Sequence, residues 1–153
     1  MNVTIAAIGK LKRGPELELA QRYQKRLRWP VVVNEQSEAP PHLSVLERKD
    51  REAEFHLQNL KSNTSLITRD ENGKNLDSQA FAFLVRDLIE KNGPDLRFAI
   101  GGPDGLGKSV LERSNFILSF GKLTWPHQIV RALLLEQLYR TQTILDGHPY
   151  HRQ

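Results

Sequence analysis

The sequence predicts an α/β protein, in the form of a three-layer sandwich around a mostly parallel sheet. Two observations support this fold class. Short apolar runs typical of buried strands alternate with amphipathic segments, and the alternation continues along the whole chain. The expected strands are Val3–Ile8, Val31–Val33, Ser65–Thr68, Leu96–Ile100 and Phe116–Phe120.

The segments between these strands carry helix signals. Pro15 suits a first helical position, and the helix that it opens must stop before Pro30. A polar helix is expected over Leu43–Leu60, where balanced charges indicate a solvated face and a thin apolar seam is formed by Leu43, Leu46, Leu57 and Leu60. The other expected helices are Ser78–Lys91, closed by Asn92-Gly93-Pro94, a short one around Val110–Ser114, and His127–Leu145.

Length and composition place the chain in a broad class. Its 153 residues contain no repeat or linker, so we expect one domain over residues 1–153. Cysteine is absent, which excludes disulfide scaffolds, thiolate zinc sites and cysteine nucleophiles. No apolar run reaches the ~18–20 residues of a membrane span, and the opening segment is a poor signal peptide. We therefore expect a cytoplasmic protein without a membrane partner.

The last expected helix differs from the others because apolar residues surround most of its circumference. They are Ile129, Val130, Ala132, Leu133, Leu134, Leu135, Leu138, Ile144 and Leu145. A helix that is apolar all round must be covered on more than one side. In a chain of this size the second cover is either the rest of the core or another subunit, and we expect a homodimer.

A glycine-rich loop, Gly101–Gly107, follows the strand Leu96–Ile100 at the position where α/β sheets bind ligands. From Gly102 to Ser109 it matches the phosphate-loop pattern, which would indicate a nucleotide triphosphatase. Pro103 removes a backbone N–H from such a cradle, no later strand ends in a magnesium-binding Asp, and only 44 residues (Val110–Gln153) follow. The alternatives are a purely structural turn, or glycines that let the backbone approach a flat ligand without phosphates, such as a nucleoside cofactor.

Three segments together form a specific constellation. They are Gly101-Gly102-Pro103-Asp104-Gly105, then Leu123-Thr124-Trp125-Pro126-His127, and the ending His148-Pro149-Tyr150-His151-Arg152. In this order and at this length, they resemble the small bacterial SPOUT-class methyltransferases that modify a pseudouridine of 23S ribosomal RNA at N3. The resemblance covers essentially the whole chain.

This resemblance implies a C-terminal trefoil knot whose loops hold S-adenosylmethionine, and two chains paired around the site. The implied cofactor contacts are Arg69, Asp70, Gly101, Gly102, Phe120, Gly121, Lys122, Leu123, Thr124 and Trp125. Two of these positions depart from the family, which usually has leucine in place of Arg69 and a smaller apolar residue in place of Trp125. Backbone contacts would survive both changes.

Methyl transfer from a sulfonium to nitrogen is an in-line displacement that needs no metal, so alignment of donor and acceptor is the enzyme's main task. The proton on N3 must also leave, which requires an acceptor or stabilisation of the developing charge. The tail Asp146–Gln153 is rich in rings and constrained residues, so we expect it to dock at the cofactor site of the partner. There Tyr150 and His151 would face the base and Arg152 a phosphate, whereas we expect His127 to be a packing residue.

The segment from Lys10 to Arg28 has seven basic residues against Glu16 and Glu18, a surplus of +5 that exceeds the +4 of the whole chain. Beside an active site, such a surplus is expected to follow phosphates without reading sequence. The expected RNA-binding residues are Lys10, Lys12, Arg13, Arg22, Lys25, Arg26 and Arg28, with Arg131 on the last helix positioning substrate. The expected partner is 23S rRNA in a ribosomal particle. A catalytically silent RNA-binding relative is the further alternative.

Overall fold

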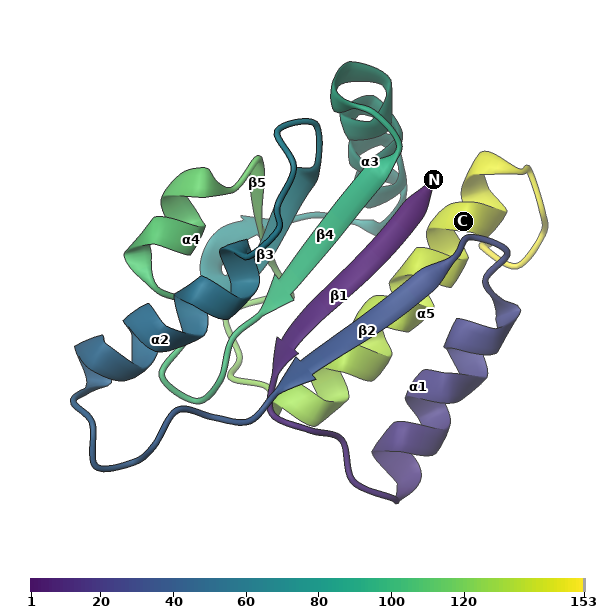
Figure 1. Ribbon diagram of the computed structural model, residues 1–153. Helices are drawn as coiled ribbons and strands as arrows, with labels where there is room; N and C mark the ends of the chain where they lie inside the picture. Colours follow the sequence, from purple (N-terminus) through teal and green to yellow (C-terminus); the bar gives the residue numbers. More distant parts are fainter. Residues whose placement is uncertain (153) are drawn as a thin grey trace.

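In the computed structural model, which describes residues 1–152, five strands form one sheet in the order β2-β1-β4-β3-β5 (Figure 1). Every pair of neighbouring strands is parallel. The strands are β1 (Asn2–Ile8), β2 (Val31–Gln36), β3 (Ser65–Asn75), β4 (Asp95–Ile100) and β5 (Phe116–Ser119). The predicted parallel α/β sheet is therefore confirmed. Gln153, the last residue of the predicted tail and domain, lies outside the described residues.

Helices cover both faces of the sheet (Figure 1). On one face lie α1 (Pro15–Arg26), α3 (Ser78–Asn92) and α5 (His127–Leu145), with α5 packed between the other two. On the other face lie α2 (Val45–Leu57) and the short α4 (Lys108–Arg113), which contact each other. Each of the five predicted helices is present, although α2 is shorter at both ends than the predicted Leu43–Leu60.

Strand β1 shows how the two faces divide the core. Val3, Ile5 and Ala7 point into the main core, which also contains Leu135 and Leu138 of α5. Ala6 and Ile8 point to the opposite face and pack with Phe55 of α2. This alternation follows from the two-residue period of a strand, and a strand that is covered on both faces needs apolar residues at nearly every position.

Helix α2 corrects one prediction about packing. The expected seam residue Leu46 is 69% exposed, and the buried positions of the helix are Glu52, Ala53, Phe55 and His56. Ser44 caps this helix through a reciprocal pair of hydrogen bonds with Glu47, and this cap fixes where the helix begins. Polar residues therefore occupy part of the buried face, which a search for apolar periodicity overlooks. Within residues 1–152, none of the helices combines the length and apolar character needed to cross a membrane.

Candidate functional site

A cavity of about 820 Å³ opens at the carboxyl ends of the strands. Its volume falls in the range of small-molecule sites, and its position is the usual ligand position of an α/β sheet. Five parts of the chain supply the lining: Lys49 of α2, residues 69–72 of β3, residues 100–106, Leu111 and Ile117 around α4, and residues 124–127 with Val130 of α5. Among the described residues, no group of three or more His, Cys, Asp or Glu side chains is placed to hold a metal ion.

A tight turn over Gly102–Gly105 forms one wall of this cavity. The backbone N–H of Gly105 donates to the carbonyl of Gly102 at 3.0 Å, and Gly105 has a φ of +81°. A Cβ on Gly101 would lie 2.9 Å from the carbonyl carbon of Gly105, which is closer than side chains tolerate. The turn's own packing therefore requires glycine at Gly101 and favours it at Gly105.

A bidentate ion pair fastens the turn to α2. Arg48 donates from Nε to Oδ2 of Asp104 at 2.8 Å and from Nη2 to Oδ1 at 3.2 Å. Arg48 also donates from Nη1 to the carbonyl of Leu43 at 2.7 Å. The hydrogen bonds from Arg48 hold the pKa of Asp104 below its ordinary value, so this carboxylate stays charged. Asp104 thus holds the glycine turn in place against α2.

Glu52 lies behind the same turn and is only 4% exposed. Its Oε2 accepts a long hydrogen bond of 3.4 Å from the backbone N–H of Ala39, and its Oε1 has no partner within residues 1–152. A Cβ on Gly102 would lie 3.0 Å from this Oε1, so the carboxyl group packs directly against the turn. Burial raises the pKa of Glu52, because a buried carboxylate loses its hydration.

The structure brings together part of the cofactor set that the sequence predicted. Arg69, Asp70, Gly101, Gly102, Thr124 and Trp125 line the cavity. Phe120, Gly121, Lys122 and Leu123 lie in the connection before them, and their side chains are not part of the lining. Trp125 donates from Nε1 to the carbonyl of Phe120 at 3.2 Å, which closes this connection into a loop beside the cavity.

Other lining residues were missed in the sequence. Glu71 and Asn72 belong to the part of β3 beyond its predicted end, and Lys49 comes from α2. His127 was expected only to pack: its ring lies against Gly9, where a Cβ would be 2.7 Å from Nε2, and it also lines the cavity. No sequence pattern marks Lys49, Glu71 and Asn72, because their proximity depends on how α2 and β3 meet the turn.

The phosphate-loop interpretation does not fit this geometry. Lys108, the lysine of the pattern, is the first residue of α4, and its side chain is 89% exposed. Its Nζ lies 3.6 Å from Oε1 of Glu112, one turn along the helix, and Lys108 does not line the cavity. The backbone of Gly102–Gly105 is closed on itself in a hydrogen-bonded turn, whereas a phosphate cradle presents successive free N–H groups.

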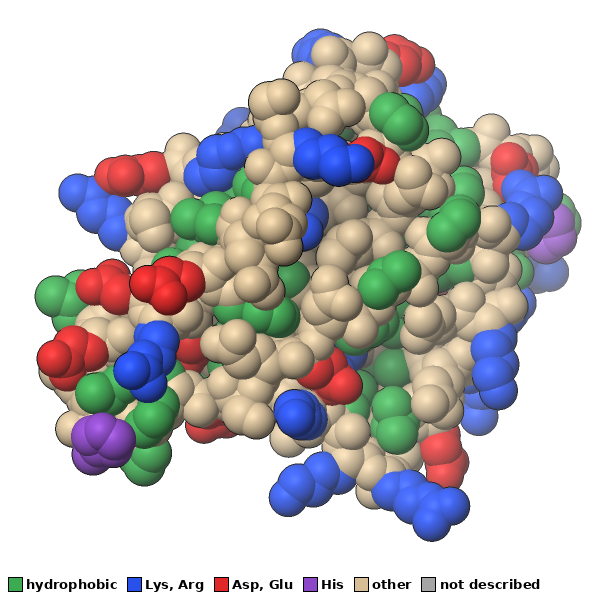
Figure 2. All heavy atoms as spheres, in the orientation of Figure 1, with side chains coloured by type: hydrophobic (Ala, Val, Ile, Leu, Met, Phe, Trp, Pro, Cys, Tyr) green, Lys and Arg blue, Asp and Glu red, His purple; other side chains and the backbone are tan. Residues whose placement is uncertain are grey.

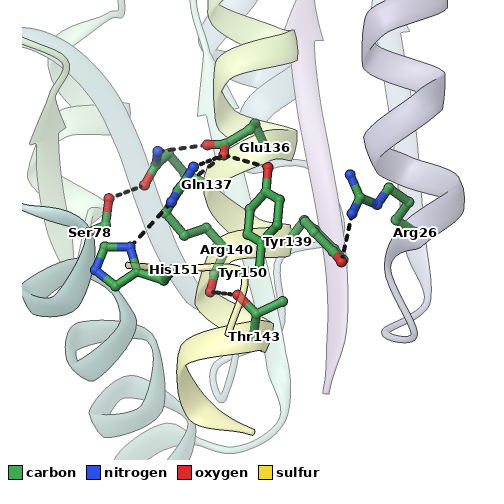
Figure 3. A network of polar contacts seen from close by, with 9 residues as sticks. All are labelled: Arg26, Ser78, Glu136, Gln137, Tyr139, Arg140, Thr143, Tyr150 and His151. Atoms are coloured by element: carbon green, nitrogen blue, oxygen red, sulfur yellow. Dashed lines mark hydrogen bonds and ion pairs between the residues drawn. The ribbon is translucent and has the colours of Figure 1, made fainter. Parts of the chain in front are cut away.

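The tail docks on the middle of α5 of its own chain, where it contacts Glu136 and Arg140 (Figure 3). The hydroxyl of Tyr150 donates to Oε1 of Glu136 at 3.2 Å, and the ring meets Tyr139 edge-on at 4.8 Å. Arg140 lies over the Tyr150 ring and contacts Nδ1 of His151 at 3.2 Å. We name this group, together with Arg26, the tail cluster.

None of the predicted catalytic residues Tyr150, His151 and Arg152 lines the cavity of its own chain. Burial, together with the neighbouring Tyr23 and Glu136, raises the pKa of Tyr150 to about 12. A phenol with this pKa stays protonated at neutral pH, so in this position Tyr150 can donate a hydrogen bond but is a poor proton acceptor.

The predicted RNA-binding residues lie along one edge of the molecule. Figure 2 shows Lys and Arg side chains along the β1–α1 connection and α1, at the bottom and right of the view, whereas acidic side chains gather over α2. Lys10, Lys12, Arg13, Arg22, Lys25, Arg26 and Arg28 are all exposed. Arg26 also lies 4.1 Å over the ring of Tyr139, and Arg28 pairs with Asp146.

The structure does not place Arg131 with the exposed basic residues that were predicted to bind RNA. Its side chain is 3% exposed, pairs with Glu35 and donates from Nη2 to the carbonyl of Gly9 at 2.9 Å. Although burial alone would raise the pKa of Glu35, hydrogen bonds from Arg131 and the backbone of Leu11 lower it overall. Arg131 therefore ties α5 to the ends of β1 and β2 and has no free surface for a phosphate. The predicted role in positioning substrate does not fit this burial, and no sequence pattern named Glu35 as the partner.

A parallel α/β sheet with an open cavity at its strand ends is the arrangement of the α/β proteins that bind small molecules. The chain belongs to the SPOUT methyltransferase family, since the family model described as "Predicted SPOUT methyltransferase" matches residues 1–151.

Named relatives match over the full length of the chain. Proteins called "Ribosomal RNA large subunit methyltransferase H" are 47% identical in Paramagnetospirillum magneticum, 47% in Agrobacterium fabrum and 41% in Rhodospirillum centenum. Each match covers 99% of this chain and 99% of the relative.

Proposed function

We propose that the chain transfers a methyl group from S-adenosylmethionine to N3 of a pseudouridine in 23S ribosomal RNA. We further propose that it acts as a single domain in the cytoplasm, on assembled ribosomes. One observation carries the proposal: a protein named for methylation of large-subunit ribosomal RNA is 47% identical over 99% of both chains. The basic edge along α1 supports a large, phosphate-rich substrate.

The cavity fits a sulfonium nucleoside in size and chemistry. It combines apolar surface from Ile100, Leu106 and Trp125 with the backbone of the glycine turn and with the cation Arg69. Bound there, S-adenosylmethionine would supply the reactive methyl group. In the proposed arrangement the glycine turn and residues 120–125 hold the nucleoside by backbone contacts, and Trp125 packs against its base. Membership in the family supports a trefoil knot built from these connections.

The tail is proposed to act across a homodimer. Ile129 and Leu133 are 37% and 36% exposed and lie one turn apart on α5, so they present apolar surface for a second chain. Because the tail does not line the cavity of its own chain, Tyr150, His151 and Arg152 would reach the cavity of the partner. There Tyr150 and His151 would contact the base, and Arg152 would contact a phosphate.

The exposed basic residues are proposed to place the substrate. Lys10, Lys12 and Arg13 precede α1, while Arg22, Lys25 and Arg26 lie on it and Arg28 follows it. Contacts of this kind hold RNA by its phosphates and carry no sequence information. The choice of nucleotide would then depend on the shape of the ribosomal site and on the tail.

The test is mass spectrometry of 23S ribosomal RNA from a strain that lacks this protein. One pseudouridine is expected to lose a single methyl mass, and the gene on a plasmid is expected to restore it. Purified protein should then methylate ribosomes from the deletion strain better than free RNA. Unchanged RNA in the deletion strain would reject the proposal. A silent RNA-binding relative would instead bind ribosomes but leave the methyl content unaltered.

A further inference from the structure

Arg69 is a cavity residue whose guanidinium group is partly buried without a partner among the residues that the structure describes. It lies in β3 beside Ile100 and Leu118, just before the register between β3 and β5 shifts. Its Nε and Nη2 atoms are buried and have no hydrogen-bond partner among residues 1–152. The ion pairs within these described residues do not include Arg69 either. Burying such donors without an acceptor costs free energy.

Arg48 shows how this edge of a guanidinium group binds a carboxylate elsewhere in the same protein. Arg48 uses the same two atoms, Nε and Nη2, to hold both oxygens of Asp104. Arg131 pairs with Glu35 through Nη1 and donates from Nη2 to the carbonyl of Gly9, while its Nε has no partner within the described residues. Arg97 donates from Nη1 to the carbonyls of His56 at 3.1 Å and Gln58 at 2.8 Å. The edge formed by Nε and Nη2 matches the two oxygens of a carboxylate in spacing and direction.

We propose that Arg69 binds the carboxylate of the amino-acid part of the methyl donor through Nε and Nη2. This inference rests on the proposed function. The carboxylate is the only anionic group of S-adenosylmethionine, whose base and ribose are neutral and whose ammonium and sulfonium groups are positive. Arg69 therefore attracts the carboxylate, and it repels the ammonium on the same carbon and the sulfonium further along the chain.

The acidic residues of the cavity complete this orientation. Asp70 and Glu71 follow Arg69 directly, and both line the cavity. Asp70 accepts a hydrogen bond from the backbone N–H of Asn72 at 2.9 Å but forms no ion pair within the described residues, whereas Asp104 is held by Arg48. The Nε and Nη2 edge is shielded from solvent in this structure, so binding as proposed would require the Arg69 side chain to turn toward the lumen that it lines.

Calorimetry with two ligands tests the inference. The ligands are S-adenosylhomocysteine and its carboxamide, which differ only in the carboxylate. The intact protein is expected to bind the carboxylate form at least about 10-fold more tightly, since a charge-assisted bidentate pair is lost in the amide. In Arg69→Met the two affinities should agree within about 2-fold, and Arg69→Lys should keep part of the difference, because it keeps the charge without the fork.

Arg97→Met is the matched control. Arg97 also has a buried Nε without a partner within the described residues, but it does not line the cavity. The Arg97→Met variant should show the same ratio of the two affinities as the unchanged protein. Equal affinities in the unchanged protein, or an undiminished ratio in Arg69→Met, would overturn the inference even if the variant were less stable. If the unchanged protein binds neither ligand, the proposed function fails along with it.

Discussion

The cavity and the tail cluster place arginine side chains in opposite situations. In the tail cluster, Arg140 donates from Nε to Glu136 at 3.1 Å, contacts His151 through Nη1 and covers the ring of Tyr150. In the cavity, Arg69 has two buried nitrogens without a partner among the described residues. A network whose members are all paired holds its segment in one place, while an unpaired buried group favours any ligand that pairs it. The contacts of the tail cluster hold the tail in place, whereas the unpaired nitrogens of Arg69 in the cavity favour binding of a ligand.

Deletion of Tyr150–Gln153 is expected to have the largest effect, and it tests whether the tail and the cavity have separate roles. Methylation of ribosomes should fall by about 1000-fold or more, because positioned groups at the reacting base would be lost. The affinity for S-adenosylhomocysteine should change by less than about 2-fold, since in the proposed arrangement Tyr150, His151 and Arg152 contact the RNA rather than the cofactor. Radiolabelled methyl transfer and calorimetry measure the two quantities, and Tyr150→Phe provides a variant that keeps the ring. Activity that survives the deletion would contradict the role of the tail.

A second prediction concerns α2, the helix that supports the glycine turn. His56 is 1% exposed, and burial together with nearby Arg97 lowers its pKa from 6.5 to about 4. It therefore binds a proton in the unfolded chain but not in the folded one between these values. The free energy of unfolding should fall as the pH drops from about 6.5 to 4, with His56 contributing up to about 3 kcal/mol.

His56→Phe is the variant that isolates this contribution, because a ring still packs beside Phe55. Urea unfolding at several pH values should show a shallower loss for the variant than for the unchanged protein. Hydrogen exchange of the unchanged protein at low pH should show faster exchange of amides in α2, while the amides of α5 stay protected. Parallel pH curves for the two proteins would mean that His56 is not neutral in the folded state.

A third prediction compares one glycine in each region. Gly101→Ala should cost about 1–3 kcal/mol, because its Cβ would lie 2.9 Å from backbone of Gly105. It should also weaken binding of S-adenosylhomocysteine, since the turn forms the cavity wall. Gly147→Ala meets nothing within 4 Å and should cost only the strain of its φ of +68°, roughly 1–2 kcal/mol. Thermal unfolding measures the loss of stability in each variant, and calorimetry measures the loss of ligand affinity. Equal losses of affinity in the two variants would argue against a special role for the turn.

The smallest expected effect is that of Lys108→Ala. The variant removes an exposed pair with Glu112 on α4, worth less than about 0.5 kcal/mol. Binding of S-adenosylhomocysteine and methylation should stay unchanged, because Lys108 does not line the cavity. A large loss of activity, or binding of magnesium–ATP that Lys108→Ala abolishes, would revive the phosphate-loop interpretation.

The sequence predicted the elements of this fold well because buried strands such as Val3–Ile8 are nearly continuous apolar runs. It also directed attention to the glycine turn, since proline and glycine at fixed spacing are local signals. The pairing of Arg48 with Asp104 was not predictable, because it joins residues 56 positions apart. The burial of Arg131 and the extension of β3 to Asn75 likewise depend on tertiary neighbours, Glu35 for Arg131 and β5 for the end of β3.

The cavity lining spans the chain from Lys49 to Val130 and draws on three strands and on helices from both layers. A ligand held there cannot remain bound once any of these segments separates, so occupancy and global unfolding are thermodynamically linked. At a ligand concentration of about 100 times its Kd, the folded state gains about 2.7 kcal/mol. In a chain of this size that gain raises the melting temperature by several degrees. Inside a cell, a supply of the bound small molecule would thus lower the fraction of unfolded copies that proteases can cleave.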